Sequence, residues 1–221
     1  MNIRRLGAIA GLLVSLAFAG TASAASISYY MDQSNAEPLL PDGVNYLQVT
    51  ISDATYGLDL NAIRFDVTLL SPLTSIAGSN FGIQTFGFNT TQTVATVLAA
   101  ITGLPGGWSA SSNSNQDGFG KFELVNSGSG SSRQNPTLTF YISGVAGDAP
   151  IDYAALSSGN AGQGNVMFAA HVAGFLDQDP GAGELTSAYF GGSTVVPVPA
   201  AVWLLGSALG MMGVLRRRAR S

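Results

Sequence analysis

Oxygen-bearing side chains at regular spacing give this 221-residue sequence its first candidate for chemistry. Asn113, Asn115 and Asp117 stand at alternate positions, and a glycine follows them. This spacing matches the first half of a calcium-binding loop, in which alternate oxygen ligands surround the ion and a glycine makes the sharp turn. The twelfth position carries a leucine where a bidentate glutamate would be needed, so the match is partial. We expect these residues either to bind calcium or to form the turns that Asn and Asp favour.

Exposed aromatic side chains would indicate carbohydrate binding, because Trp and Tyr combine an apolar ring face with a polar edge. Trp108 lies in a glycine-rich loop, and Tyr29 and Tyr30 are adjacent near the start of the expected mature chain. Trp108 is equally suited to closing one end of a hydrophobic core. A carbohydrate-binding module is therefore an alternative function, with Trp108 as its candidate residue.

The sequence offers little for catalysis. Its single histidine, His171, lies in an apolar segment and is expected to be structural. No G-x-S-x-G elbow, H-E-x-x-H motif or phosphate-binding loop occurs. Paired carboxylates could still serve a glycosidase, but Asp66 beside Arg64 and Glu123 beside Lys121 are expected on solvent-facing sides of strands. We therefore predict a protein that is not an enzyme and has no cofactor except calcium as a candidate, and keep a secreted glycan-cleaving hydrolase as the weaker alternative.

Strands are the elements that must position these residues. Alternation of apolar and polar side chains, typical of a strand with one buried face, occupies the segments 46–52, 62–70, 119–125 and 137–143. Less regular strand candidates are the segments 26–31, 81–89, 93–99, 165–175 and 186–190. Within 81–89 the apolar phase changes, and Gly82 or Gly87 could supply the bulge that permits this change. A brief helix is expected over 150–158.

Many short strands, frequent glycine turns and no long helical period predict an all-β fold. We expect a single antiparallel β-sandwich, of cohesin-like or jelly-roll type, over residues 25–194. Residues 103–133 are rich in Gly, Ser and Asn and should form two long loops around the strand 119–125. An N-terminal signal helix and a C-terminal transmembrane helix would flank the sandwich.

The N-terminus predicts export. Two arginines precede an apolar run, residues 6–20, and small residues follow it. A basic start, a short apolar centre and an Ala-Ser-Ala ending describe a secretory signal peptide over residues 1–24. We expect cleavage between Ala24 and Ala25, and the alternative is a second membrane anchor.

The C-terminal segment, residues 195–221, has three parts in a fixed order. The first is a motif of alternating valine and proline, formed by Val196, Pro197, Val198 and Pro199. An uncharged run over 200–215 follows, and as a helix it would be about 24 Å long. The basic tail 216–221 contains the arginines Arg216, Arg217, Arg218 and Arg220. Arginines directly after a membrane helix stay in the cytoplasm, which leaves the preceding domain outside.

This order of proline motif, block 203–207, small-residue helix with Gly210 and Gly213, and terminal arginines resembles the PEP-CTERM sorting signal of Gram-negative bacteria. Val198 stands where the family motif has glutamate, so the tail is similar to the VPxP variant. The resemblance covers 27 of 221 residues. It implies processing by an exosortase, a membrane protease that cuts near the proline motif. It also implies transient anchoring in the inner membrane, and then a place at the cell surface or in an extracellular matrix of exopolysaccharide or biofilm.

Charge and cysteine content exclude several other functions. Residues 25–194 contain three basic and thirteen acidic residues, a net charge of −10. Such a surface repels nucleic acid and anionic lipid but tolerates divalent cations and neutral glycans. The chain has no cysteine, which excludes thiol catalysis and cysteine-ligated metals. The sequence therefore predicts an exported, non-catalytic surface or matrix protein whose partners are an exosortase, the membrane and extracellular polysaccharide, and not nucleic acid.

Overall fold

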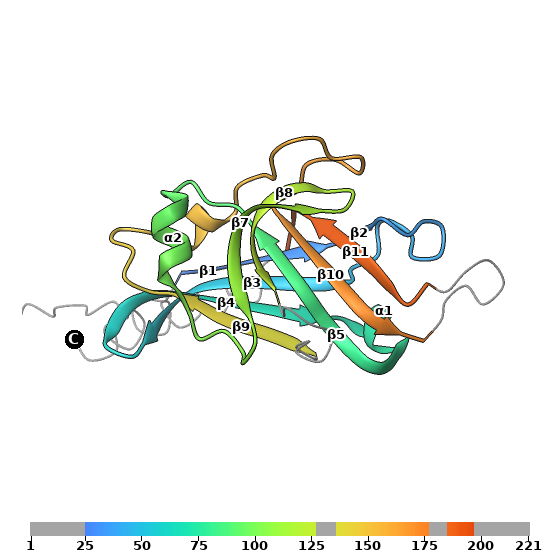
Figure 1. Cartoon of the computed structure of the whole chain (residues 1–221), viewed down its shortest axis with the longest axis horizontal. Coiled ribbons are helices and arrows are strands. Elements are labelled where there is room, and N and C mark those ends of the chain that lie inside the picture. The colour runs from blue at the N-terminus through green and yellow to red at the C-terminus, as the bar shows by residue number, and fades with distance from the viewer. Residues whose placement is uncertain (1–24, 127–135, 177–184, 197–221) are drawn as a thin grey trace, which may run out of the picture.

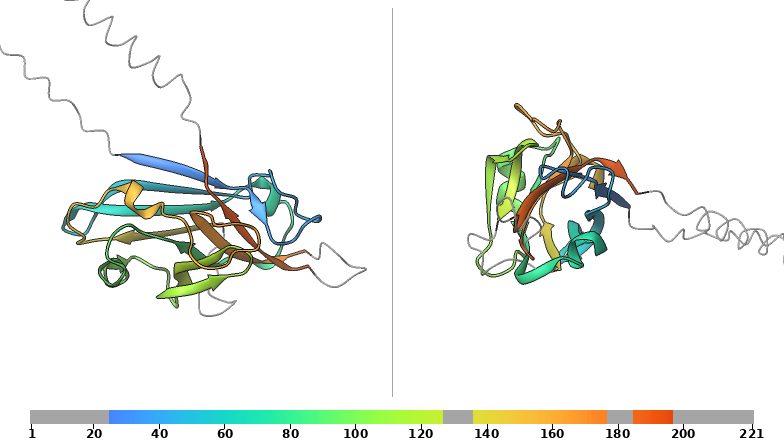
Figure 2. Two further views of the ribbon diagram at one scale, coloured as in Figure 1. Left: turned by 90° about the horizontal axis from the view of Figure 1, so that it is seen from above. Right: turned by 90° about the vertical axis from the view of Figure 1, so that its right-hand side faces the viewer.

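The computed structural model describes residues 25–126, 136–176 and 185–196. These residues form two six-stranded antiparallel sheets, which are the two layers of Figures 1 and 2. The predicted all-β fold is therefore confirmed. The expected signal peptide, the run 200–215 that is expected to cross the membrane, and the basic tail all lie outside the described residues. Within the described ranges, no helix has both the length and the apolar character that crossing a membrane requires.

The first sheet contains the N-terminal strand and the last strand of the described chain side by side. Its strands, in spatial order, are β12 (Thr194–Val195), β1 (Ser26–Met31), β3 (Leu47–Tyr56), β4 (Asp59–Leu69), β9 (Thr137–Ile142) and β6 (Ile101–Thr102). In β9 and in the segments 47–52 of β3 and 63–69 of β4, every second side chain is buried, as the alternating sequence pattern predicts. One face of this sheet therefore meets the core and the other faces solvent.

The second sheet lies over the first. Its strands, in spatial order, are β2 (Gln33–Ser34), β11 (Ser187–Gly192), β10 (Phe168–Phe175), β5 (Ala77–Phe88), β8 (Gly120–Asn126) and β7 (Ser109–Gln116). The short helices are α1 (Ser71–Thr74), α2 (Val94–Ala100) and the 3₁₀ helix η2 (Pro150–Tyr153). Helices α2 and η2 lie at one end of the two layers, on the left of Figure 1.

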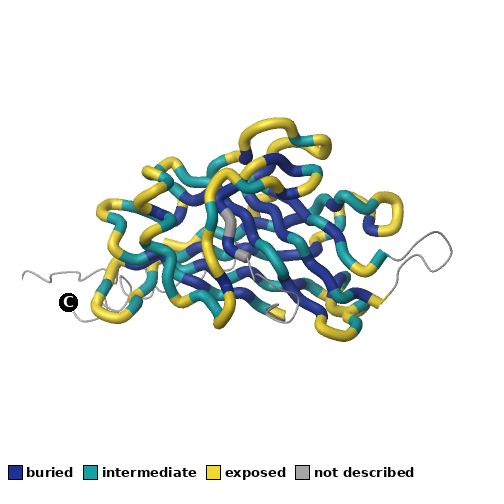
Figure 3. The backbone as a smooth tube through the Cα atoms, viewed as in Figure 1, coloured by how far each residue is buried: buried dark blue, intermediate teal, exposed yellow. Residues whose placement is uncertain are grey.

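Aromatic rings from both sheets fill the main core. Phe65 of the first sheet stacks on Phe140 with ring centroids 4.6 Å apart and contacts Phe88 of the second sheet at 5.0 Å. Tyr29 and Phe168 join the two sheets in the same way, at 5.2 Å. Burial follows the strands, while exposed segments lie mostly in loops and at hairpin ends (Figure 3). Apolar burial of this extent is the main source of stability in a chain without disulfides.

A smaller apolar cluster lies on the opposite face of the second sheet. It consists of Phe119, Phe122, Val166 and Ala169. The hairpin between β7 and β8 folds back to reach it, because Gln116 accepts a hydrogen bond from Thr85 of β5 at 3.1 Å. At the tip of the same hairpin, Asp117 accepts a hydrogen bond from the amide group of Asn35 at 3.0 Å. Both faces of the second sheet are therefore partly covered.

Most predicted strands are present, but the segment 93–99 is helix α2 rather than a strand. Its Thr and Val residues favour strands in isolation, yet only Val97 is buried, so one helical face meets the core. The structure also corrects the long loop expected over 103–133, because residues 109–116 form strand β7. Ser and Asn have low strand propensity, and pairing with β8 stabilises this segment.

The bulge predicted in segment 81–89 is confirmed in a different position. Ile83 pairs with Val172 and Thr85 pairs with His171, so Gln84 is the extra residue. Gly87 has another role, because a β-carbon there would lie 2.8 Å from the side chain of Phe122. The brief helix expected over 150–158 is present as the shorter η2.

Candidate functional site

The outward face of the first sheet carries a continuous set of polar side chains, here called the polar face. It consists of partly exposed residues from β1, β3, β4, β6 and β9, namely Ser28, Tyr30, Gln48, Thr50, Ser52, Arg64, Asp66, Thr68, Thr102, Thr137, Thr139 and Tyr141. Strand alternation places them opposite the core residues. Neighbouring strands bring them into rows, such as Thr50, Asp66 and Thr139.

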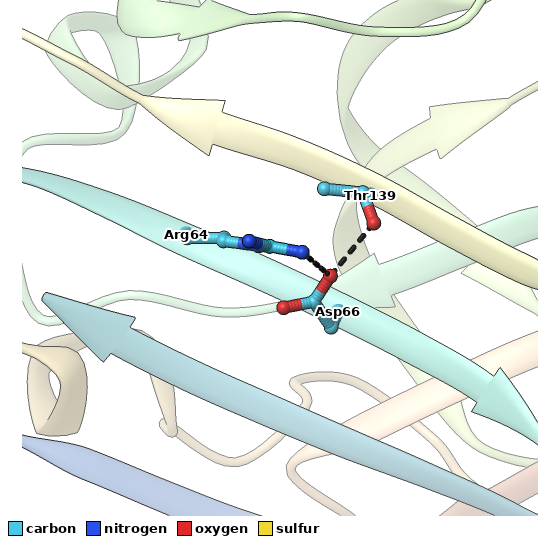
Figure 4. A network of polar contacts seen from close by, with 3 residues as sticks. All are labelled: Arg64, Asp66 and Thr139. Carbon is cyan, nitrogen blue, oxygen red and sulfur yellow. Dashed lines mark hydrogen bonds and ion pairs between the residues drawn. The ribbon is translucent and has the colours of Figure 1, made fainter. Parts of the chain in front are cut away.

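An ion pair stands at the centre of the polar face (Figure 4). Arg64 Nη2 lies 2.7 Å from Asp66 Oδ1, and the same oxygen accepts a hydrogen bond from Thr139 Oγ1 at 2.7 Å. The side chains of Arg64 and Asp66 are 43% and 25% exposed. The hydrogen bond to Asp66 raises the pKa of Arg64. The pair is therefore charged, held in a fixed orientation and open to solvent.

Two tyrosines stand beside this ion pair. The rings of Tyr56 and Tyr141 are 4.6 Å apart, and the Arg64 guanidinium lies 6.0 Å from the centre of the Tyr141 ring. The Tyr56 hydroxyl accepts a hydrogen bond from Thr102 at 3.3 Å. Gly103, at φ +68°, permits this packing, because a β-carbon there would lie 2.9 Å from Tyr141. The polar face thus combines partly exposed aromatic rings with oriented hydrogen-bonding groups.

A second candidate lies at the end of the molecule that carries α2. There the turn between β3 and β4 and the loop 144–149 border a cavity of about 830 Å³, here called the end groove. Asp53, Asp59 and Asp148 are among its lining residues, together with the exposed Leu60. Its volume is in the range of small-molecule sites.

The carboxylates of the end groove accept hydrogen bonds from neighbouring segments of the fold. Asp59 accepts hydrogen bonds from Ser143 and from the backbone of Gly144, both at 2.8 Å. Backbone hydrogen bonding from Asn61, followed by these two contacts, lowers the pKa of Asp59. Burial raises the pKa of Asp148, whose carboxylate accepts a hydrogen bond from the hydroxyl of Tyr153. Two carboxylates whose pKa values move apart resemble an acid and a base, although their contacts show that both also hold loops together.

The three residues of the calcium motif lie along the β7–β8 hairpin. Asn113 is at a bulge in β7 with φ +53°, Asn115 pairs with Lys121, and Asp117 is in the hairpin turn. Among the described residues, no group of three or more histidine or acidic side chains is placed to hold a metal.

The structure places the predicted aromatic candidates mostly in the interior. Trp108 is 9% exposed and packs with the main core, which is the core-closing role that the sequence left open. Tyr29 is 4% exposed, while Tyr30 lies on the polar face. His171 stacks on Tyr189 with ring centroids 4.4 Å apart, as expected for a structural histidine.

The position of Glu123 differs from the one that the strand pattern predicts. The sequence predicts it on the solvent side of its strand beside Lys121, but it is only 8% exposed. It pairs with the buried Phe88, and its neighbour Phe122 is buried on the opposite face of the strand in a cluster with Phe119, Val166 and Ala169. Because both faces of β8 are covered, alternation of residue types does not distinguish a buried face from a solvent-exposed face in this strand.

The predicted processing sites meet the described chain at its two ends. The backbone nitrogen of Ala25 donates a hydrogen bond to Asp53 at 2.8 Å. The nitrogen of Val196 donates one to Ser28 of β1 at 2.9 Å. The other predicted residues of these sites lie outside the described part of the chain, namely Ala24, Pro197, Val198, Pro199, Arg216, Arg217, Arg218 and Arg220.

Comparison with known proteins gives no assignment for either candidate site. No protein family, no curated protein and no solved structure matches this chain.

Tyr56 and Tyr141 are the site residues that sequence reasoning missed. Alternation in the segment 137–143 already predicts Tyr141 on the solvent-facing side with Thr139. The proximity of Tyr56 and Arg64 depends on how β3, β4 and β9 pair. Sequence alternation alone does not specify which strands become neighbours.

Proposed function

We propose that this protein is an exported, non-catalytic component of the cell surface or extracellular matrix. Its folded body is a β-sandwich of cohesin-like or jelly-roll type, and its C-terminal tail is a PEP-CTERM signal that an exosortase cuts near Pro197 and Pro199. Before cleavage, the run 200–215 anchors it in the inner membrane. After cleavage, the body associates with exopolysaccharide or biofilm.

The observation that supports this proposal most is the agreement between strand limits and expected cuts. Strand β1 starts at Ser26, just after the Ala24–Ala25 bond, and β12 ends at Val195, just before the proline motif. The two strands pair with each other, Tyr29 opposite Val195. Removal of both tails would therefore break no strand pairing in either described sheet.

The contact between Ala25 and Asp53 gives further support. Cleavage after Ala24 would turn the Ala25 amide into a charged amino group. That group would lie against the Asp53 carboxylate, 2.8 Å from the present nitrogen position. An ion pair would replace a hydrogen bond from an uncharged donor to the same carboxylate, so the processed end is compatible with the fold.

Fractionation of producing cells tests the proposal. In a strain with the exosortase we expect the protein at the surface or in the medium. In a strain without the exosortase we expect it in the inner membrane, with its tail intact. Equal distribution in both strains would contradict exosortase processing, and recovery from the cytoplasm would contradict export.

A secreted glycan-cleaving hydrolase is the second candidate, and the end groove favours it. Asp148 would be the acid and Asp59 the charged partner, since their pKa values are raised and lowered. Release of reducing ends from neutral polysaccharides decides between the two. Activity that is lost in Asp148→Asn, with folding retained, would establish the hydrolase. We propose instead that both residues fix loops, for which Asp148→Asn lowers thermal stability only.

A further inference from the structure

We propose that the polar face binds a neutral glycan chain around Arg64, Asp66 and Tyr141. This inference deepens the proposed function, because it gives the exported body a means of holding extracellular polysaccharide. The proposed binding surface does not include Trp108, which is buried in the main core.

The chemistry of the face fits a polyhydroxylated ligand. Sugar hydroxyls need donors and acceptors in fixed positions, and the Arg64–Asp66 pair provides both within one oriented unit. The contact with Asp66 uses Nη2, and Nε is buried without a hydrogen-bond partner, so the donors that can face a ligand are those on Nη1 and Nη2. Thr139 fixes the carboxylate from the neighbouring strand and so limits its rotation. Binding would then require little further ordering of these side chains.

Aromatic rings supply the apolar part of such a site. Tyr141 is only partly buried, its ring lies 4.6 Å from the ring of Tyr56, and the guanidinium of Arg64 lies 6.0 Å from its centre. The apolar face of a sugar ring can stack on a tyrosine whose hydroxyl stays in contact with water. The packing of Gly103 against Tyr141 holds the ring in place.

Charge selects a neutral glycan over an anionic one. Arg64 and Asp66 are the charged residues of the polar face, and they neutralise each other. Residues 25–194 have a net charge of −10, which repels a polyuronate. A neutral chain meets no such barrier and can extend over the adjacent Ser, Thr and Gln side chains.

Calorimetric titration of the full chain in mild detergent tests this inference. The neutral probes are cellohexaose, mannohexaose and maltohexaose. An alginate hexamer is the anionic probe for comparison. We expect at least one neutral hexasaccharide to bind. Tyr141→Ala should weaken that binding at least tenfold, and Arg64→Lys at least threefold because lysine lacks the planar fork.

Tyr189→Ala is the matched control, since Tyr189 is a partly exposed tyrosine of strand β11 in the second sheet, away from the polar face. It should change the affinity less than twofold. Thermal unfolding of each variant verifies folding, and Asp66→Asn replaces Tyr141→Ala if that variant does not fold. The proposal is overturned if no neutral probe binds, if alginate binds more tightly, or if the folded variants keep full affinity. These outcomes leave export and tail cleavage intact, because fractionation measures those separately.

Discussion

Glu123 is a carboxylate held in the interior, and its surroundings make it sensitive to pH. It is 8% exposed, its Oε2 atom has no hydrogen-bond partner among the described residues, and burial raises its pKa. A backbone hydrogen bond from Asn113 opposes this shift only in part. The folded protein therefore binds the Glu123 proton more tightly than the unfolded chain does. Stability from this group is present below the ordinary pKa of 4.5 and is lost as pH rises through the raised value.

Glu123→Gln should remove this pH dependence. At pH 7 the variant should be more stable than the wild type by about 1 kcal/mol. The wild type buries a charged carboxylate whose Oε2 atom has no hydrogen-bond partner, and glutamine carries no charge. Near pH 4 the difference should disappear, since the wild-type carboxyl is then protonated. Urea unfolding of both proteins between pH 4 and pH 7 measures this. A constant difference across that range would contradict a buried ionisable role for Glu123.

Asp53 should contribute more to stability after signal-peptide removal than before it, because its contact with Ala25 then becomes an ion pair. In the processed protein, Asp53→Asn removes the partner of the new Ala25 amino group and should lower the free energy of unfolding by up to about 1 kcal/mol, as for exposed ion pairs. Acetylation of that amino group should have the same effect. Urea unfolding of the processed and uncut forms provides the comparison. An equal loss in the uncut form would show that the charge on Ala25 is not involved.

The β7–β8 hairpin is the element whose position depends most on close packing. It folds over the second sheet because Gly191 leaves room for the ring of Phe119, with which a β-carbon at position 191 would clash. Gly191→Ala should therefore lift the hairpin and lower stability by about 1–3 kcal/mol. Limited proteolysis should then cut within residues 109–126 first. Gly162→Ala is the control, because no atom lies within 4 Å of its added carbon, and unchanged proteolysis in Gly191→Ala would contradict the packing argument.

Strands that bury only one face could be predicted from the sequence. Elements that depend on contacts with distant segments could not. The segments 62–70 and 137–143 alternate cleanly because only one of their faces meets the core. Strand β7 and helix α2 lack such a signal, since pairing with β8 and contact through Val97 decide their conformations. The candidate site could likewise be predicted only in part. Tyr141 follows from alternation, whereas its contact with Tyr56 depends on tertiary pairing.

At the scale of the whole molecule, both ends of the described chain lie on one edge of the first sheet, where β12 pairs with β1. Ala25 and Val196 therefore leave the fold from neighbouring strands. The body between them needs no disulfide, because aromatic rings from both sheets fill its core. These features agree with a domain that is exported, anchored for a time and then cut free. Its polar face and end groove would then both meet the extracellular medium.

Intact-mass measurement of the protein recovered from the medium tests this account most directly. The predicted product begins at Ala25 and ends close to Pro199, without the apolar run 200–215 and the terminal arginines. Its mass should agree with the described body and its internal loops, with no further cut. A secreted product that still contains Arg216 to Arg220 would contradict the account, and so would a product that starts well inside β1.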